Sequence, residues 1–385
     1  MVVFNTAVED FEETVVFLEG CDAFAKAVEI TCEVGGCVEY FDCDGPVLMG
    51  LINGRNLKER NDLQRNAPPP RGDPKPPRTN PKPPTRENTM NDEKLQTFKS
   101  LTFGTELEYE NITRQKMAEA ILSVVGGRIT SYNGPHNAIT VTDPEGREWK
   151  AMSDGSLRNG AEFVTPILRW ENIELLQAVI RAIRHAGAKT PATTSQHVHV
   201  GVEGWTAEQL TNLVRIHYKQ EKLIHKAFGT LESRLAHYTR PTDRDFVERI
   251  LSRKPRTLDE LNEAWFGRRQ TEFAHYDDHR YRSLNLNPVW EPKHTVEWRF
   301  GNGTTHSAEA KSMVAICLAM AAKAKMARAA SGRNPREYSE ASAKYDMRVF
   351  LLHLGLSGAE FKNIRMHLLK RLPGSAAWKN GRPQA

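Results

Sequence analysis

The sequence predicts a mixed fold of the α+β or α/β class, in which strands and helices alternate. Three observations predict it. The stretch FGTELEYE at 103–110 alternates acidic with apolar residues, as a strand with one apolar side does. The next stretch, RQKMAEAILSVVG, places Met117, Ile121, Leu122 and Val125 at helical spacing. Three later stretches, HVHVG, SLNLN and TVEWRF, return to the alternation of strands.

The composition is that of an ordinary water-soluble protein. With 385 residues, 39% of them hydrophobic, the chain can form one large domain or two unequal ones. The net charge of +5 is far from the dense basic patches of nucleic-acid binders, so we do not expect a nucleic-acid partner. The first residues, MVVFNTAVEDFEE, lack a basic segment followed by an apolar run, and no window approaches about 18 apolar residues. We therefore expect a cytoplasmic protein without a membrane partner.

Residues 1–65 are predicted to form a small, acidic, β-rich module, whose function the sequence does not indicate. Its strand-like runs are ETVVFLEG, AVEITCEV and GCVEYFDC, separated by Gly and Asp turns. Four cysteines lie in this module: Cys21, Cys32, Cys37 and Cys43. They form no C-x-x-C pair, which favours reduced thiols and leaves a structural zinc site open. We expect Cys317, in an apolar helix, to pack in the core.

Residues 66–94 are predicted to be a proline-rich linker. The part from 66 to 88 contains nine prolines with scattered Arg and Lys, a composition that favours extended polyproline II and cannot build a core. A spacer is the simplest interpretation, and its PxxP spacing leaves a protein partner open.

Residues 95–385 are predicted to form the main domain. Its first strand covers 102–110 and is followed by the helix at 114–126. Further helices are expected at 171–186, within 206–228, at 257–266 and, as a long apolar helix, at 307–329. The last segment places Ser357 and Glu360 in the spacing of a capping box before the helix FKNIRMHLLKRL.

The predicted strands carry polar groups on one side. Because successive strand residues point to opposite sides, each strand contributes a same-side set. These sets are Glu106, Glu108 and Glu110; His197 and His199; Ser283, Asn285 and Asn287; and Thr295, Glu297 and Arg299. A single strand of this kind is normally just solvent-exposed, but together the four sets lack Lys and are rich in metal ligands.

Carboxylates with imidazole favour Mg²⁺ or Mn²⁺ over zinc, which draws on Cys or several His. Arg299 lies two residues from Glu297 and could hold a phosphoryl group beside the metal. The segment SDGSLRNGAEFVTP adds Asp154, near the end of the sheet, and Glu162, on a strand. There is neither a Walker A sequence nor a kinase-type Gly-rich loop.

In order and content, five segments resemble the amidoligase family of the glutamine-synthetase-like carboxylate–amine ligase superfamily. The matching segments are FGTELEYE, DGSLRNGAEFVTP, HVHVG, RYRSLNLN and TVEWRFGNGT, and the tail LGLSGAEFKNIRMHLLKRL is also similar. The resemblance covers about residues 100–375. It implies an α+β fold with a curved antiparallel sheet that forms one wall of a funnel and is packed with helices.

The resemblance also implies cofactors and residue roles. ATP and Mg²⁺, or Mn²⁺, would be bound, with Glu106, His197 and Glu297 at one ion and Glu108 and Glu162 at another. His199, the other member of the H-x-H pair, is also a candidate metal ligand, and either histidine could be the one that only packs. Arg299 would stabilise the transferring phosphoryl group, Asp154 would orient or deprotonate an amine, and Arg280 or Arg282 would clamp phosphate or a substrate carboxylate. Glu110 matches no role and is expected to be a surface acid, and Asn285 is expected to bond backbone or substrate.

The function that follows is ATP-dependent joining of a small-molecule or peptide carboxylate to an amine through an acyl phosphate. Two alternatives stay open. One is a non-catalytic scaffold with a ligase fold that binds an acidic or nucleic-acid partner. The other is a phosphotransferase similar to a guanidino kinase, which would release a phosphorylated product without an amide.

Overall fold

The computed structural model describes residues 2–6, 36–42, 45–50, 86–272 and 277–379. The chain divides into two compact units, Met1–Lys82 and Pro83–Ala385. In the first unit, β1 (Val2–Thr6), β2 (Gly36–Asp42) and β3 (Gly45–Gly50) form an antiparallel sheet in the order β1-β2-β3. The strand-like runs predicted at 13–20 and 27–34 lie outside the described residues.

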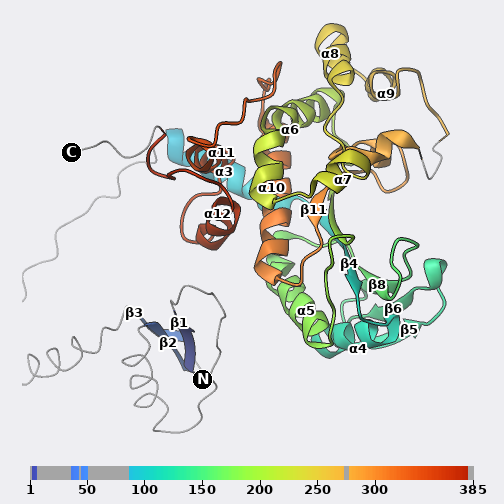
Figure 1. Ribbon diagram of the computed structural model, residues 1–385, viewed down its shortest axis with the longest axis vertical. Helices are drawn as coiled ribbons and strands as arrows, with labels where there is room; N and C mark the ends of the chain where they lie inside the picture. Colours follow the sequence, from blue (N-terminus) through green and yellow to red (C-terminus); the bar gives the residue numbers. More distant parts are fainter. Residues whose placement is uncertain (1, 7–35, 43–44, 51–85, 273–276, 380–385) are drawn as a thin grey trace, which may run out of the picture. The chain divides into compact units, whose positions relative to one another are not determined.

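The second unit is built on one open, eight-stranded antiparallel sheet in the order β10-β11-β9-β4-β8-β7-β6-β5. Figure 1 labels β4, β5, β6, β8 and β11 of this sheet. The strands are β4 (Phe103–Glu110), β5 (Arg128–Ser131), β6 (Ile139–Thr142), β7 (Glu148–Met152), β8 (Gly160–Val164), β9 (Ser195–Gly201), β10 (Leu284–Asn285) and β11 (Thr295–Asn302). Helices and strands therefore form a mixed α+β unit, as predicted.

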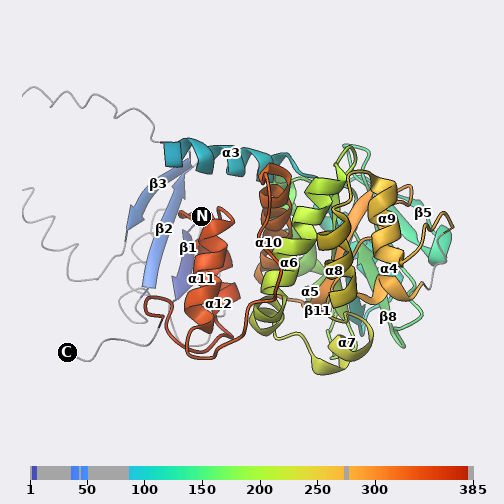
Figure 2. The same cartoon turned by 90° about the horizontal axis from the view of Figure 1, so that it is seen from above.

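The helices of this unit are α3 (Arg86–Ser100), α4 (Arg114–Val125), α5 (Ile173–His185), α6 (Ala207–Phe228), α7 (Glu232–His237), α8 (Arg244–Arg253), α9 (Leu258–Phe266), α10 (Ser307–Met326), α11 (Ala343–His353) and α12 (Lys362–Leu369). Of these, α4, α6 and α10 pack directly on the sheet, and most of the others pack on these helices. Figure 2 shows α10 beside α6, and α10 also packs on α5, α12 and β9. Because α10 is surrounded by other elements, it is apolar on nearly all sides, and Cys317 within it is fully buried, as predicted.

Strand β4 lies at the centre of the sheet, and its two sides differ in chemistry. Leu107 and Tyr109 are fully buried in the core under the helices. Antiparallel pairing then sets Glu106 opposite His197 on β9 and Glu108 opposite Glu162 on β8. Because directly opposite residues project from the same side of a sheet, three strands bring their polar groups together.

Gly160 allows the close approach of β8 to β4. A Cβ atom at this position would lie 2.0 Å from the carbonyl oxygen of Tyr109, so only glycine fits without moving a strand.

Three sequence-based expectations about elements are wrong. The linker was expected to run to residue 94, but α3 already begins at Arg86. The capping box before α12 does not form, because the side chain of Glu360 accepts a hydrogen bond from Trp170 Nε1 (2.8 Å) instead. The strand expected over 283–287 is only two residues long, since Asn287 begins a short 3₁₀ helix at the proline that follows it.

Among the described residues, no helix combines the length and the apolar character needed to cross a bilayer.

Candidate functional site

The polar side of the sheet gathers two groups of potential metal ligands. The first acidic group consists of Glu106, His197 and Glu297, from the neighbouring strands β4, β9 and β11. The second acidic group consists of Glu108, Asp154 and Glu162, from β4, the turn after β7, and β8. In each group, one ligand atom per residue lies within 4.8 Å of the others. The structure thus brings together six residues that were selected from the sequence.

His197 is oriented by contacts on both sides of its ring. Its Nδ1 atom lies 3.5 Å from Glu106 Oε2 and 3.4 Å from Glu297 Oε1. Its Nε2 atom is 3.1 Å from the hydroxyl oxygen of Ser195. A proton on Nε2, donated to that hydroxyl, leaves the Nδ1 lone pair facing the two carboxylates. Burial and the charge of Arg299 lower the pKa of His197, which favours the neutral ring that a metal requires.

Ser195 is a residue that the sequence pattern missed. We expect Ser195→Ala to weaken Mg²⁺ binding about 10- to 100-fold, because loss of the partner of a ligand histidine frees its ring and tautomer. Isothermal titration calorimetry measures the affinity, and Ser123→Ala, at an exposed position on α4, is the matched control. Equal affinities of the two variants would contradict the assignment.

His199 has a different environment from His197. Its Nε2 atom lies 3.3 Å from Glu106 Oε1 but, although buried, forms no hydrogen bond. Burial disfavours its charged form, yet the nearby charge of Glu106 raises the pKa of His199 above its ordinary value. Reciprocally, burial opposes ionisation of Glu106, but the charge of His199 and contacts with both imidazoles hold the pKa of Glu106 well below its ordinary value. His199 therefore neutralises part of the acidic charge and stands outside the first acidic group.

The second acidic group combines a fixed carboxylate with one that resists ionisation. Glu108 Oε2 accepts a hydrogen bond from the backbone N–H of Ser195 (2.9 Å), which fixes its position. Asp154 accepts hydrogen bonds from the N–H (2.7 Å) and the hydroxyl of Ser156, so the turn orients it. Burial, together with the charges of Glu106 and Asp154, raises the pKa of Glu162 to about 9. At neutral pH this carboxyl group holds a proton unless a cation replaces it.

Arg299 and Asn285 hold the carboxylate of Glu297. Arg299 Nη1 donates to Oε1 (2.5 Å), and Asn285 Nδ2 donates to Oε2 (2.7 Å). Burial opposes the charge of Glu297, but Arg299 and the two histidines lower its pKa to about 2. The Asn285 side chain also accepts from the backbone N–H of Asn287, which agrees with its expected role as a hydrogen-bonding residue.

A second buried guanidinium, Arg234 on α7, was not predicted. It is only 5% exposed and donates to the carbonyl oxygen of Arg299 (2.9 Å), so it supports β11 from behind Arg299. Burial lowers its pKa to about 10, although the charge of Glu108 opposes this shift. Its Nε atom is buried without a hydrogen-bond partner. The short helix α7 carries no periodic signal in the sequence that could have singled it out.

The two other arginines selected from the sequence contact different partners. The guanidinium groups of Arg280 and Arg299 lie 5.7 Å and 5.9 Å from the centre of the Tyr281 ring. Arg282 donates instead to the carbonyl oxygen of Pro241 (3.2 Å). Arg280 therefore shares the Tyr281 ring with Arg299, whereas Arg282 binds the backbone of Pro241.

A buried polar network supports the strand that carries Asn285. His225 Nε2 lies 2.8 Å and His217 Nε2 3.1 Å from the hydroxyl oxygen of Ser283, and His217 Nε2 also contacts Glu221. Ser283, which the sequence grouped with the polar face, thus points into the protein beneath α6. Its carbonyl oxygen accepts from Arg299 N–H (3.0 Å), so this network positions β10 against β11.

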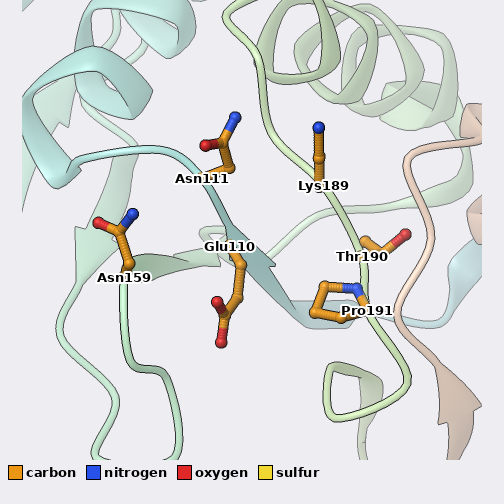
Figure 3. Close-up of a pocket in the computed structure, with 6 residues that line it drawn as sticks. All are labelled: Glu110, Asn111, Asn159, Lys189, Thr190 and Pro191. Carbon is orange, nitrogen blue, oxygen red and sulfur yellow. The ribbon is translucent and has the colours of Figure 1, made fainter.

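The remaining carboxylate of β4, Glu110, belongs to neither acidic group. Its Oε1 atom accepts one long hydrogen bond from Arg158 N–H (3.4 Å), and the side chain is partly exposed, as predicted for a surface acid. Glu110 lines a pocket with Asn111, Asn159 and Lys189, drawn in Figure 3.

Divalent cations fit the two acidic groups. The donors are carboxylate oxygens and one imidazole, the set that suits Mg²⁺ and Mn²⁺. The raised pKa of Glu162 indicates that the second acidic group lacks enough positive charge to hold all its carboxylates ionised, as expected of a site that takes a cation.

Comparisons with known proteins point to one enzyme family. The profile of the family described as "Putative amidoligase enzyme" matches residues 99–321. No curated protein matches the chain. Two solved structures are similar at 10% identity. One is a bifunctional glutathione synthetase from Pasteurella multocida (TM-score 0.40, covering 73% of this chain and 48% of that one). The other is the complex of the prokaryotic ubiquitin-like protein Pup with its ligase PafA (TM-score 0.27, covering 70% and 62%). The chain spans about half the length of the first structure.

Proposed function

Because the chain belongs to the amidoligase family, we propose that it joins a carboxylate to an amine at the expense of ATP. The single observation that carries this proposal is the pair of acidic groups side by side on one sheet, flanked by the buried Arg299. Amide formation from a carboxylate needs activation of a poor leaving group, and phosphoryl transfer needs neutralisation of charge.

In this proposal the first acidic group and Arg299 form the nucleotide end of the site. Glu106, His197 and Glu297 would hold one Mg²⁺ or Mn²⁺, and Glu108 and Glu162 a second one. When bound, such ions neutralise phosphate charge and polarise the phosphoryl oxygen. Arg299 contributes a fixed guanidinium next to Glu297, and Arg280, which contacts the same Tyr281 ring as Arg299, would clamp a phosphate of the nucleotide.

The proposed reaction has two steps, phosphorylation of the carboxylate and then attack by the amine. An oxygen of the acceptor carboxylate attacks the γ-phosphorus of ATP, the bond to the β,γ-bridging oxygen breaks, and ADP leaves with an acyl phosphate behind. The amine nitrogen then attacks the acyl carbon, and the bond to the phosphate oxygen breaks to release inorganic phosphate. The nitrogen loses a proton, and Asp154, which Ser156 orients, would accept it. Arg299 would stabilise the phosphoryl charge through a buried, weakly hydrated guanidinium group, which Arg234 helps to position by donating to the carbonyl oxygen of Arg299.

The test supplies the full-length protein with ATP, Mg²⁺ and paired pools of amino acids, peptides and amines. ADP release is followed, and products are identified by mass spectrometry. Amide formation with equal amounts of ADP and phosphate supports the proposal. A phosphorylated product without an amide supports the guanidino-kinase alternative. No turnover with any pool, together with Mg²⁺–ATP affinity that is unchanged in Glu297→Ala, contradicts both and favours a scaffold.

Cation binding is expected to depend on pH through Glu162. This carboxyl group has a pKa of about 9 in the metal-free protein, so a cation at the second acidic group must displace its proton at neutral pH. Mg²⁺ affinity should therefore rise by up to about tenfold per pH unit between pH 6 and 8.5. Calorimetry in two buffers with different ionisation enthalpies measures the released proton. A heat that is independent of the buffer would contradict the prediction.

A further inference from the structure

A pocket of about 450 Å³ lies beside the second acidic group, at the end of β4. It is lined by Glu110, Asn111, Asn159, Lys189, Thr190 and Pro191, as Figure 3 shows. These residues come from three segments: the end of β4, the turn before β8, and the segment before β9. Every lining residue except Pro191 has a polar or charged side chain, so the pocket offers a ligand both charged and hydrogen-bonding groups.

The pocket continues the polar face that carries the two acidic groups. Glu110 follows Glu108 at a two-residue step, so both side chains project from the same side of β4, about 7 Å apart. The segment before β9 also connects the two places, because it lines the pocket with Pro191 and leads into β9, whose first residue, Ser195, donates its N–H to Glu108. A molecule with one end at the second acidic group can therefore place its other end in the pocket.

Two residues that line the pocket, Glu110 and Lys189, carry opposite charges and do not neutralise each other. Glu110 and Lys189 are directly opposite on an isolated antiparallel bridge and exchange backbone hydrogen bonds of 2.8 and 2.9 Å. Opposite residues of such a pair project from the same side, with Cβ atoms about 5 Å apart. Nevertheless, they form no ion pair, and Figure 3 shows their charged ends splayed apart. Among the described residues, no acidic group pairs with the Lys189 ammonium, and Glu110 accepts only the long bond from Arg158.

The walls are held in place by the backbone. Asn111 N–H donates to the carbonyl oxygen of Asn159 (2.8 Å), and Asn111 Nδ2 donates to that of Gly187 (2.9 Å). Asn111 has φ +60°, a conformation that non-glycine residues rarely adopt, and these contacts hold it there. A pocket fixed in this way is formed before a ligand arrives, which reduces the entropy lost on binding.

We propose that this pocket binds the non-reacting α-amino-acid end of one substrate, with its ammonium at Glu110 and its carboxylate at Lys189. Asn111, Asn159 and Thr190 supply further hydrogen-bonding groups around it. The orientation of the substrate, with its reacting end at the second acidic group, rests on the proposed ligase function. It narrows the substrate class to a free amino acid or a short peptide with a free α-amino-acid end, and disfavours simple alkyl amines.

The test measures binding separately from catalysis, with L-glutamine, N-acetyl-L-glutamine and L-glutamine amide as probes. These differ in charge at the α-carbon, so ligand-observed NMR titration of the full-length protein reports charge recognition. L-glutamine is expected to bind at least tenfold more tightly than either capped form. Glu110→Gln and Lys189→Met should each weaken it at least tenfold. The matched controls are Glu203→Gln, at the far end of β9, and Lys222→Met, on the exposed side of α6, both of which should bind L-glutamine as the wild type does.

The outcomes separate this inference from the proposed function. Equal binding of free and capped probes, or binding that survives in both pocket variants, overturns the pocket assignment even if the protein forms amides. In an active ligase, the variants should raise KM for one organic substrate and leave KM for ATP unchanged, and unchanged KM values for all substrates would equally overturn it. Selective binding that is lost in both variants supports the pocket even if no ADP is released, in which case only the ligase proposal fails.

Discussion

Replacing Glu162 by glutamine is expected to abolish most activity while leaving the metal-free protein at least as stable as the wild type. Loss of a residue that only hydrogen-bonds to a metal ligand typically lowers metal affinity or activity about 10- to 100-fold. Loss of a direct ligand should therefore lower kcat/KM by at least about 10²-fold. The amide has nearly the shape of the protonated carboxyl group that a pKa of about 9 implies at neutral pH. The substitution therefore removes a ligand without removing a charge that the fold uses.

The sign of the stability effect follows from the direction of the pKa shift. Glu162 titrates near 4.5 when unfolded and near 9 when folded, so between these pH values the folded state binds more protons than the unfolded state. Its contribution to the free energy of unfolding therefore falls as pH rises from about 4.5 to 9, by roughly 3 kcal/mol at pH 7. Glutamine does not titrate, so the free energy of unfolding of Glu162→Gln does not decrease in this way. The Tm of the metal-free variant should therefore exceed that of the wild type, and the difference should grow from pH 6 to 8.5.

Scanning calorimetry with and without Mg²⁺ and steady-state kinetics test this prediction. Mg²⁺ should stabilise the wild type more than the variant. Glu148→Gln is the control, because Glu148 lies on the neighbouring strand β7 with an exposed side chain that pairs with Lys150. A variant that is less stable than the wild type at every pH, or fully active, would mean that Glu162 is a structural carboxylate.

The prediction from sequence was most successful where strand alternation decides which way a side chain points. Glu106, Glu108, His197 and Glu297 share one side of the sheet because the apolar residues between them must face the helices. The division into two groups was not available from spacing, since it depends on the register of β4 with β8 and β9, which pair over long stretches of sequence. The resemblance to the amidoligase family, and not the spacing, suggested it.

Other parts of the site could not be predicted because their roles arise only from tertiary contacts. Ser195 matters through its distance to His197, and Arg234 through its burial behind Arg299. Strand alternation placed Ser283 on the polar face of the sheet. The strand is short, however, because a 3₁₀ helix begins four residues later, and the Ser283 hydroxyl instead forms hydrogen bonds with His217 and His225 on α6. A capping-box pattern failed before α12 in the same way, since Trp170 offers Glu360 a competing hydrogen bond.

Arg299→Lys is expected to be the most damaging conservative substitution in the nucleotide end of the site. An arginine that stabilises a transferring phosphoryl group is worth about 10³- to 10⁵-fold in kcat, and we expect a loss of about 10³-fold or more. Lysine keeps the positive charge but not the planar fork that lets Arg299 bond Glu297 Oε1 with Nη1 while its Nε reaches the carbonyl oxygen of Tyr238 (3.4 Å).

Comparison with Arg299→Met separates catalysis from folding. Methionine would leave the buried carboxylate of Glu297 without its cation, which should lower the free energy of unfolding by about 3–5 kcal/mol. Lysine should avoid most of this cost. The positive charge of Arg299 is the main cause that lowers the pKa of Glu297, whereas burial raises it, and the ammonium group of lysine supplies the same charge. Single-turnover measurement of ADP formation, with Tm determined on the same samples, therefore distinguishes the two roles. If Arg299→Lys loses stability in step with activity, or forms ADP at the wild-type rate, Arg299 serves the fold and the phosphoryl group must be stabilised by other residues.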